Sequence, residues 1–229
     1  MAGLQTIIDN CNGIAIDRRK VVGIQTTRNE VARTSETPTF QPWRMRLDMP
    51  ASLRYNNARQ LMEALDVLDR NTPEVVTFSN NSCLSWIFKY QGTMSTIQRN
   101  PITVSSFVGN VLTLTNLPAI GSTRVMFKPN DLIQIGNNTY PFTSTTEVTR
   151  GTGTTVQIIT NRPNILTTSV TGNTLKYGND CSFNMFCPNM PIYKLVPGGY
   201  QRDSNGTTIN NALVEFSDSF DLYEWVATA

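Results

Sequence analysis

Four carboxylates close together in the sequence could do chemistry as a group. Glu215, Asp218, Asp221 and Glu224 recur at a spacing of three residues. Carboxylates held side by side can act as a general acid–base pair or bind calcium. Aromatic and apolar residues stand between them throughout. This interleaving favours the solvated edges of a strand that closes a sheet over a catalytic or metal site.

Basic residues gather at two places. Residues 18–20 form the only basic run, and two arginines follow Trp43 in alternate positions. A basic run can clamp a phosphate, and arginines beside a tryptophan can stack on nucleic-acid bases. We interpret the run as a turn or one side of a subunit interface, and the arginine pair as the polar face of an antiparallel strand. The candidate contacts between subunits are Arg18, Arg19, Lys20, Arg44 and Arg46.

The sequence lacks the residues of familiar active sites. It contains no histidine, which removes the commonest general base, the usual Ser-His and Cys-His nucleophile pairs and nearly every zinc site. Residues 148–153 (Val-Thr-Arg-Gly-Thr-Gly) are superficially similar to a phosphate-binding glycine loop, but the lysine and the following helix are missing. The serines form no nucleophile elbow. We therefore predict that the protein is not an enzyme and has no catalytic residues.

The cysteines give no metal-binding pattern. They are Cys11, Cys83, Cys181 and Cys187, and no two of them form a Cys-x-x-Cys pair. Cys181 and Cys187 are close enough in sequence for a disulfide. In a chain that folds in a cytosol, buried free thiols are favoured. We predict no metal and no cofactor.

Composition narrows the class of protein further. Charged residues make up 16% of the chain and the net charge is +2, whereas charged residues average about 25% in soluble proteins. Specific nucleic-acid or membrane binding is therefore not predicted. No apolar run approaches the ~20 residues that span a bilayer, and the first residues do not resemble a secretory signal. We expect synthesis in a cytoplasm.

One helix is predicted, over residues 55–70. Its apolar residues fall on one helical face: Ala58, Leu61, Met62, Leu65 and Leu68. Asn56 or Asn57 is expected to cap its start, and residues 71–73 to end it. No second helix is predicted, so we expect the apolar face to lie on a sheet.

The rest of the chain has the pattern of short strands. Residues 43–49 alternate between apolar and charged side chains, which indicates a half-buried strand. Further strands are predicted at 21–31, 74–79, 83–91, 102–108, 111–117, 124–127, 131–135, 139–143, 155–160, 173–177, 181–186, 192–196, 212–216 and 220–226. Hairpin turns are predicted at 109–110, 136–138 and 151–153. Residues 34–38 and 50–52 are predicted to break strands, and 197–211 to form a loop.

These elements predict a mainly β fold. Strands at spacings of about 8–12 residues are typical of a small barrel or sandwich. Charges are sparse and threonine, asparagine and glycine are dense in the middle of the chain. We therefore predict a host β-sandwich formed by residues 1–104 plus 175–229, with one flanking helix (about 56–70). Residues 105–174 are predicted to form an inserted, small β-barrel-like subdomain.

Two stretches resemble tail structural proteins of tailed bacteriophages. In residues 39–50, an aromatic and arginine-containing strand runs through a proline turn toward the predicted helix. In residues 128–142, a Lys-Pro-Asn-Asp turn opens a hydrophobic hairpin, and Arg162-Pro163 follows. The chain resembles baseplate and distal-tail-like proteins of that group over most of its length. Asn130 stands where the pattern usually has glycine.

The resemblance implies a fold and a role. It implies a tail-tube-like β-sandwich or barrel that assembles into a ring, expected to be a hexamer, at the distal end of a phage tail. The ring would join the tail tube to other baseplate proteins and let DNA pass through its lumen, so the expected location is the virion tail. The resemblance brings no catalytic residues. Two alternatives stay open: a receptor- or carbohydrate-binding module of a virion, and a neck or connector protein.

Overall fold

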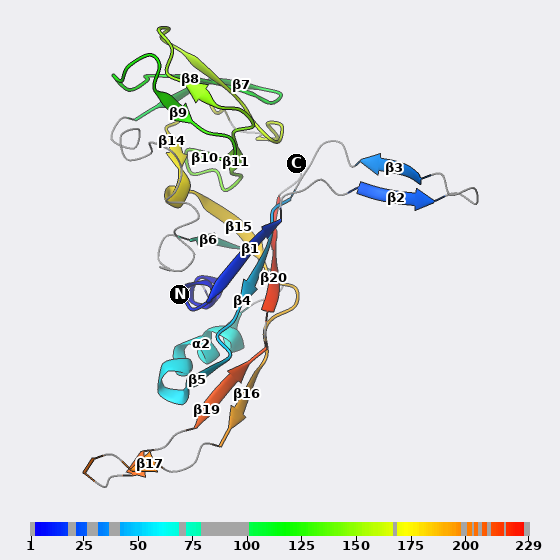
Figure 1. The fold of residues 1–229 in the computed structure, drawn as a ribbon, viewed down its shortest axis with the longest axis vertical. Coiled ribbons are helices and arrows are strands. Elements are labelled where there is room, and N and C mark those ends of the chain that lie inside the picture. Colours follow the sequence, from blue (N-terminus) through cyan, green and yellow to red (C-terminus); the bar gives the residue numbers. More distant parts are fainter. Residues whose placement is uncertain are drawn as a thin grey trace. The chain divides into compact units, whose positions relative to one another are not determined.

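The computed structural model is mainly β, as the sequence predicts (Figure 1). The structure describes residues 3–17, 22–26, 32–36, 42–68, 72–78, 101–166, 169–197, 201–202, 204–205, 208–209, 212–217 and 219–226. The helices in these ranges are α1 (Gly3–Asp9), α2 (Tyr55–Val67) and the short 3-10 helix η1 (Gly178–Asp180).

The strands run along nearly the whole described chain. They are β1 (Gly13–Asp17), β2 (Val22–Thr26), β3 (Ala32–Glu36), β4 (Arg44–Asp48), β5 (Ser52–Arg54), β6 (Glu74–Thr77), β7 (Thr103–Val108), β8 (Val111–Thr115), β9 (Val125–Phe127), β10 (Leu132–Ile135), β11 (Phe142–Thr143), β12 (Val148–Thr149), β13 (Val156–Ile159), β14 (Leu175–Tyr177), β15 (Ser182–Phe186), β16 (Tyr193–Val196), β17 (Gln201–Arg202), β18 (Thr208–Ile209), β19 (Leu213–Phe216) and β20 (Ser219–Glu224).

The chain divides into two compact units. The first comprises residues 1–16, 44–86 and 183–225, and the second comprises residues 17–43, 87–182 and 226–229. The subdomain predicted at 105–174 falls inside the second unit, which also takes in residues from both sides of that span.

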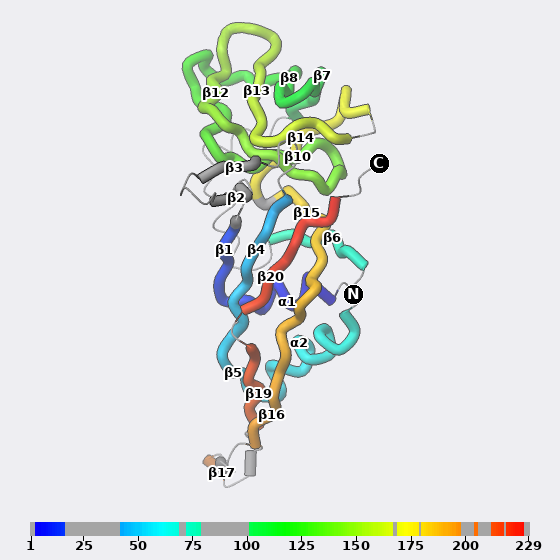
Figure 2. The backbone as a smooth tube through the Cα atoms, turned by 90° about the vertical axis from the view of Figure 1, so that its right-hand side faces the viewer, coloured from blue at the N-terminus to red at the C-terminus, as the bar shows by residue number. Residues whose placement is uncertain are grey.

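The first unit contains a five-stranded sheet in the order β1-β4-β20-β15-β6 (Figure 2). The alternation predicted around β4 is confirmed, because Met45 and Leu47 are buried while the charged residues between and beside them are exposed. The strand predicted at 220–226 is found as β20, which pairs with β4 on one side and β15 on the other. A second sheet has the order β16-β19-β5.

Helix α2 is correctly predicted but begins differently. Arg54 is its N-cap residue and makes no side-chain capping bond, so the predicted caps at Asn56 and Asn57 are wrong. The physical reason is that β5 runs directly into the helix. Arg54 pairs with Leu213 in β19, and the Tyr55 N–H donates to the Ala212 carbonyl oxygen at 3.0 Å. The predicted break at 50–52 is therefore also wrong at its end, since Ser52 lies in β5.

Helix α1 was not predicted, and it changes what α2 packs against. Leu4, Ile7 and Ile8 are buried, and α1 lies against α2 as well as β6. A Cβ atom at Gly3 would stand 3.1 Å from the Ala64 carbonyl oxygen, so glycine allows the close approach of the helices. The expectation that the apolar face of α2 lies on a sheet alone is wrong, because a second helix covers part of it.

Within the described part of the second unit, the eight short strands β7 to β14 surround one core. We call the described residues of 101–177, which hold β7 to β14, the β-module. Its sheets have the orders β13-β8-β7, β11-β10-β14 and β12-β9. The shared core is aliphatic and aromatic: Ile102, Val104, Phe107, Leu112, Leu114, Met126, Phe127, Ile133, Ile135, Tyr140, Phe142, Val148, Ile158, Val170, Leu175 and Tyr177.

Turn chemistry shapes the β-module. The Gly109-Asn110 turn joins the paired strands β7 and β8, and Gly136 opens the return to β11, which pairs with β10. Both glycines have positive φ angles, 57° and 56°. The predicted hairpin at 151–153 is wrong, because β12 pairs with β9 while β13 pairs with β8.

Asn130 has a left-handed backbone with φ of 74°. This conformation favours glycine, and asparagine tolerates it better than most other residues. The turn is closed by the Asp131 carboxylate, which accepts a hydrogen bond from the Lys128 N–H at 2.8 Å. The asparagine that replaces the usual glycine of the resembled pattern is therefore compatible with this turn.

The structure differs from the sequence prediction in several further segments, and one predicted strand lies where the structure is not described. The strand predicted at 21–31 is described as β2, and residues 34–36 of the predicted break lie in β3, which pairs with β2. The predicted loop 197–211 contains the paired strands β17 and β18. The strand predicted at 83–91 lies outside the described residues.

Candidate functional site

Two of the five predicted contact residues lie on one exposed face of the first unit. Arg44 and Arg46 project from β4, and β20 pairs with it in the register that sets Arg46 opposite Asp221. The Arg44 Nη2 lies 2.8 Å from the Asp221 Oδ2, and the Arg46 Nε donates to the Ser219 Oγ at 2.9 Å. The Arg44 guanidinium also lies 5.5 Å from the Tyr223 ring centroid. We call these residues the arginine face.

The other three predicted contact residues, Arg18, Arg19 and Lys20, lie outside the described residues. The structure therefore brings Arg44 and Arg46 together, and the prediction for residues 18–20 stays a prediction. Both arginines are held in place by neighbours on β20, which leaves their guanidinium groups ordered and partly exposed. An ordered, exposed arginine is well suited to a protein contact.

The acidic residues do not form a cluster. Asp221 belongs to the arginine face, but Glu224 is only 5% exposed, with Phe220 and Leu222 also buried along β20. Because successive residues of a strand point to opposite faces, a spacing of three residues puts Asp221 and Glu224 on opposite faces of β20. The expectation that these carboxylates are solvated is wrong for Glu224. Asp218 lies outside the described residues.

Three cysteines are described, namely Cys11, Cys181 and Cys187; all are buried, and none forms a disulfide with another described cysteine. Burial raises the pKa of Cys11 to about 12, with a smaller contribution from the carboxylates of Asp48 and Asp9. Burial also raises the pKa of Cys181 well above its ordinary value. The thiols of Cys11 and Cys181 are therefore protonated at neutral pH, and a protonated thiol is a weak nucleophile. Cys83 lies outside the described residues.

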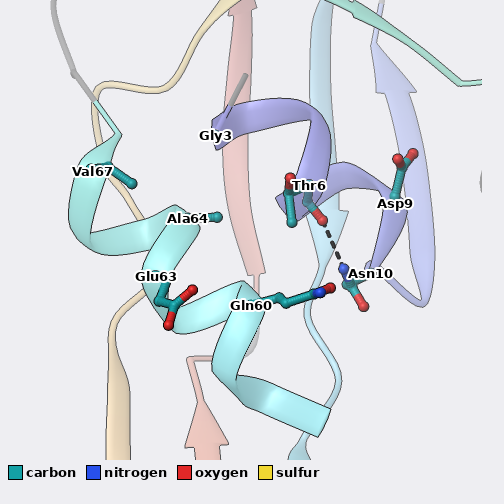
Figure 3. Close-up of a pocket in the computed structure, with 8 residues that line it drawn as sticks. All are labelled: Gly3, Thr6, Asp9, Asn10, Gln60, Glu63, Ala64 and Val67. Carbon is teal, nitrogen blue, oxygen red and sulfur yellow. Dashed lines mark hydrogen bonds between the residues drawn. The ribbon is translucent and has the colours of Figure 1, made fainter. Parts of the chain in front are cut away.

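A groove of about 500 Å³ lies between α1 and α2 within the first unit (Figure 3). Five of the eight residues that line it have polar side chains, but most of the lining surface is apolar: Gly3, Thr6, Asp9, Asn10, Gln60, Glu63, Ala64 and Val67. The Asn10 side chain donates to the Thr6 carbonyl oxygen at 2.8 Å, and the Glu63 carboxylate accepts from the Arg59 Nε at 2.9 Å. The groove offers hydrogen bonds to a ligand, and these lining residues include no thiol, imidazole or amine. The sequence did not indicate it because α1 was not predicted.

Arg162 lies in the second unit as a buried cation surrounded by aromatic rings. The side chain is 1% exposed, and its Nε donates to the Pro141 carbonyl oxygen at 3.0 Å. Its Nη2 donates to the same oxygen. The guanidinium lies 3.6 Å from the Tyr140 ring centroid and 5.8 Å from those of Trp43 and Phe142.

This cluster ties a distant segment to the β-module. The Trp43 Nε1 also donates to the Pro141 carbonyl oxygen, at 3.4 Å. Arg162 and Trp43 are therefore joined through one carbonyl, although they are far apart in the sequence. Because the guanidinium is closed off from solvent, its role is to hold these segments together. The resemblance includes Arg162, but the sequence did not indicate that it is buried.

An uncharged sheet face lies on the β-module. Val108, Val111 and Ile159 are exposed large aliphatic residues on β7, β8 and β13. Neither residues 101–123 nor residues 151–161 contain an aspartate, glutamate, lysine or arginine. Exposed apolar residues that gather on one face indicate a contact surface.

The described part of the chain has neither a metal-binding cluster nor a membrane-spanning helix. Among the described residues, no three His, Cys, Asp or Glu side chains are grouped so that they could hold a metal ion. The helices of the described part are too short and too polar to cross a bilayer.

Comparison with known proteins gives no family. No protein-family model matches the sequence, and no curated protein matches it significantly.

Proposed function

We propose that the chain is a structural subunit of a bacteriophage tail or baseplate, which assembles into a ring that joins the tail tube to other baseplate proteins. Its first unit would have the tail-tube-like sandwich or barrel, and the β-module would be an inserted barrel-like subdomain. The proposed partners are other copies of the chain, in a ring of about six, and other tail or baseplate proteins. DNA would pass through the lumen without specific binding, and the proposed location is the virion tail.

One observation carries the proposal: exposed strand faces in both units bear side chains suited to protein–protein contact. The arginine face presents guanidinium groups and Tyr223 from two central strands of the five-stranded sheet. The β-module presents aliphatic side chains on a surface without charges. Arginine and tyrosine are enriched in interfaces, and exposed aliphatic clusters gain free energy when a partner covers them. The resemblance to phage tail proteins supplies the kind of assembly.

The location is tested by labelling. Antibody raised against the purified chain is added to phage particles released from cells that carry the gene, and the particles are viewed by negative-stain electron microscopy. We expect gold label at the distal end of the tail. Label on the head alone, or particles without label, would overturn the proposed function.

The ring is tested by mass photometry of the purified chain, alone and with the protein encoded beside it. We expect a species of about six copies. The double variant R44A/R46A should lower the fraction of ring, because both side chains belong to the proposed contact. R59A is the matched control, since Arg59 is an exposed, ion-paired arginine on α2. Monomers under every condition, or equal loss of ring in both variants, would contradict this assignment.

A further inference from the structure

The sheet formed by β7, β8 and β13 has an inner face and an outer face. The inner face is buried in the core of the β-module through residues such as Phe107, Leu112 and Ile158. Side chains alternate between the two faces of a strand, so their neighbours point outward. Figure 2 shows the path of these three strands within the β-module.

Three outward side chains form a continuous row across this sheet. Ile159 pairs directly with Val111, and Val111 pairs directly with Val108. Residues directly opposite each other in antiparallel strands point to the same face and lie in contact distance. Their exposed fractions are 48%, 38% and 75%. We call these three residues the aliphatic row.

The surroundings of the aliphatic row are neutral. Next along the strands come Gln157, Thr113 and Ser106, which also pair across the sheet. No charged residue occurs in β7, β8 or β13, or in the turn at 109–110. The face therefore combines apolar side chains with short hydroxyl and amide groups, which cost little to cover when they find hydrogen-bond partners.

The edges of the sheet are already occupied at several points. On the β7 side, Val104 donates to the Asn173 carbonyl oxygen at 2.9 Å and accepts from the Gly172 N–H at 2.8 Å. On the β13 side, the Ile159 carbonyl oxygen accepts from the Thr145 N–H at 2.8 Å and from its hydroxyl at 2.9 Å. A partner strand cannot pair with these groups. A partner must therefore meet the face and not the edges.

We propose that this outer face is where two copies of the chain contact each other, with the aliphatic row at the centre of the interface. The absence of charged residues on this face indicates which partner fits it. A charged surface placed here would lose water without gaining an opposite charge. The same face of a second copy is neutral, apolar at its centre and self-complementary about a twofold axis. A twofold contact joins copies in pairs and does not itself close a ring, so the inference goes beyond the proposed function and does not depend on the contacts that close the ring.

The row alone is smaller than the ~800 Å² per partner of a standard interface, so the neighbouring threonine, serine and glutamine residues must take part. We therefore expect reversible association with a dissociation constant on the order of micromolar. This association should be visible with the purified full chain, without other tail proteins.

Sedimentation velocity of the full chain over about 1–100 µM tests the proposal. We expect the weight-average sedimentation coefficient to rise with concentration for the wild type. The double variant V108K/I159K should weaken association at least about tenfold, because two lysines would face each other across the twofold axis. V67K is the matched control, since Val67 is a valine on α2 with a similar exposed fraction of 78%. It should associate like the wild type.

Circular dichroism and the melting temperature establish that each variant is folded, and V108K alone replaces the double variant if that one unfolds. A wild type that stays monomeric, or a folded variant that associates as the wild type does, would overturn the inference. Binding of the face to another protein by a monomeric chain would overturn it too. Each result is separate from the labelling experiment: labelled tails with a V108K/I159K variant that associates like the wild type leave the tail location standing, and association that these lysines weaken, without labelled tails, leaves the inference standing.

Discussion

Replacing Arg162 by alanine should destabilise the second unit more than any surface arginine would. The substitution removes a guanidinium that donates twice to the Pro141 carbonyl oxygen and lies 3.6 Å from the Tyr140 ring centroid. Hydrogen bonds from charged donors contribute about 1.5–3 kcal/mol, and a desolvated cation–π contact contributes about 2 kcal/mol. The cost of burying the cation disappears with the side chain, which offsets part of this loss.

The expected net loss is about 3 kcal/mol in the free energy of unfolding, after that offset and including the cavity left behind. For a chain of this length, each kcal/mol lowers the melting temperature by about 2–4 °C, so the expected decrease is about 6–12 °C. R162K should lose about half as much, because lysine keeps the charge but cannot stack on Tyr140 with a planar group.

Urea unfolding measures the prediction, with tryptophan fluorescence as a probe near Trp43 and far-UV circular dichroism as a probe of the whole chain. R46A is the control, because Arg46 is exposed, and its loss should change stability by at most about 0.5 kcal/mol. If R162A unfolds within about 0.5 kcal/mol of the wild type, the buried cation does not hold the cluster together. An R162K variant as unstable as R162A would show instead that the planar group, and not the charge, is what matters.

Three further predictions concern the first unit. L61D should cost at least about 3 kcal/mol, because it places a carboxylate at a buried position of α2; an unchanged melting temperature would contradict that placement. Q5A should cost about 1–3 kcal/mol, because the Gln5 amide bonds both the N–H and the carbonyl oxygen of Thr77. Q5E should cost more than Q5A in urea unfolding, because its carboxylate would face the Asp9 carboxylate to which the amide donates at 2.9 Å. The Cys11 pKa is raised from 9.0 to about 12 in the folded state, so its contribution to stability is full below pH 9 and is lost as the pH rises toward 12. The melting temperature of C11A should therefore fall less over that pH range than the melting temperature of the wild type. An equal fall in both would refute the assignment.

Local patterns predicted the elements whose signals are contained within a few residues. The strand β4 was recognisable because one face is solvated, which leaves charged residues alternating with Met45 and Leu47. The β7–β8 hairpin was recognisable because Gly109 and Asn110 suit its turn. Helix α2 was recognisable because apolar residues recur at helical spacing from Ala58 to Leu68, over almost three turns.

Elements that depend on distant partners were missed. Helix α1 has only seven residues and several β-branched ones, so its own propensity is weak, and it is held by contacts such as that between Gln5 and Thr77. Strand β5 is specified by its pairing with Leu213 and Val214, far along the chain. The burial of Arg162 depends on Trp43 and Tyr140, which no spacing rule connects, and arginine is ordinarily exposed.

The order of strands in the five-stranded sheet determines when its strands can pair while the chain is being synthesised. Strand β20 lies between β4 and β15, and Arg44 and Asp221, which it brings together, are 177 residues apart in sequence. A ribosome that has just released β4 must add all the intervening residues before the neighbouring strand exists, so this pairing forms late and slowly. The β-module, whose strands follow one another within 101–177, can collapse first. A fragment that stops before Ser219 would therefore hold a folded β-module beside a sheet without its middle strand, exposed to aggregation and proteolysis.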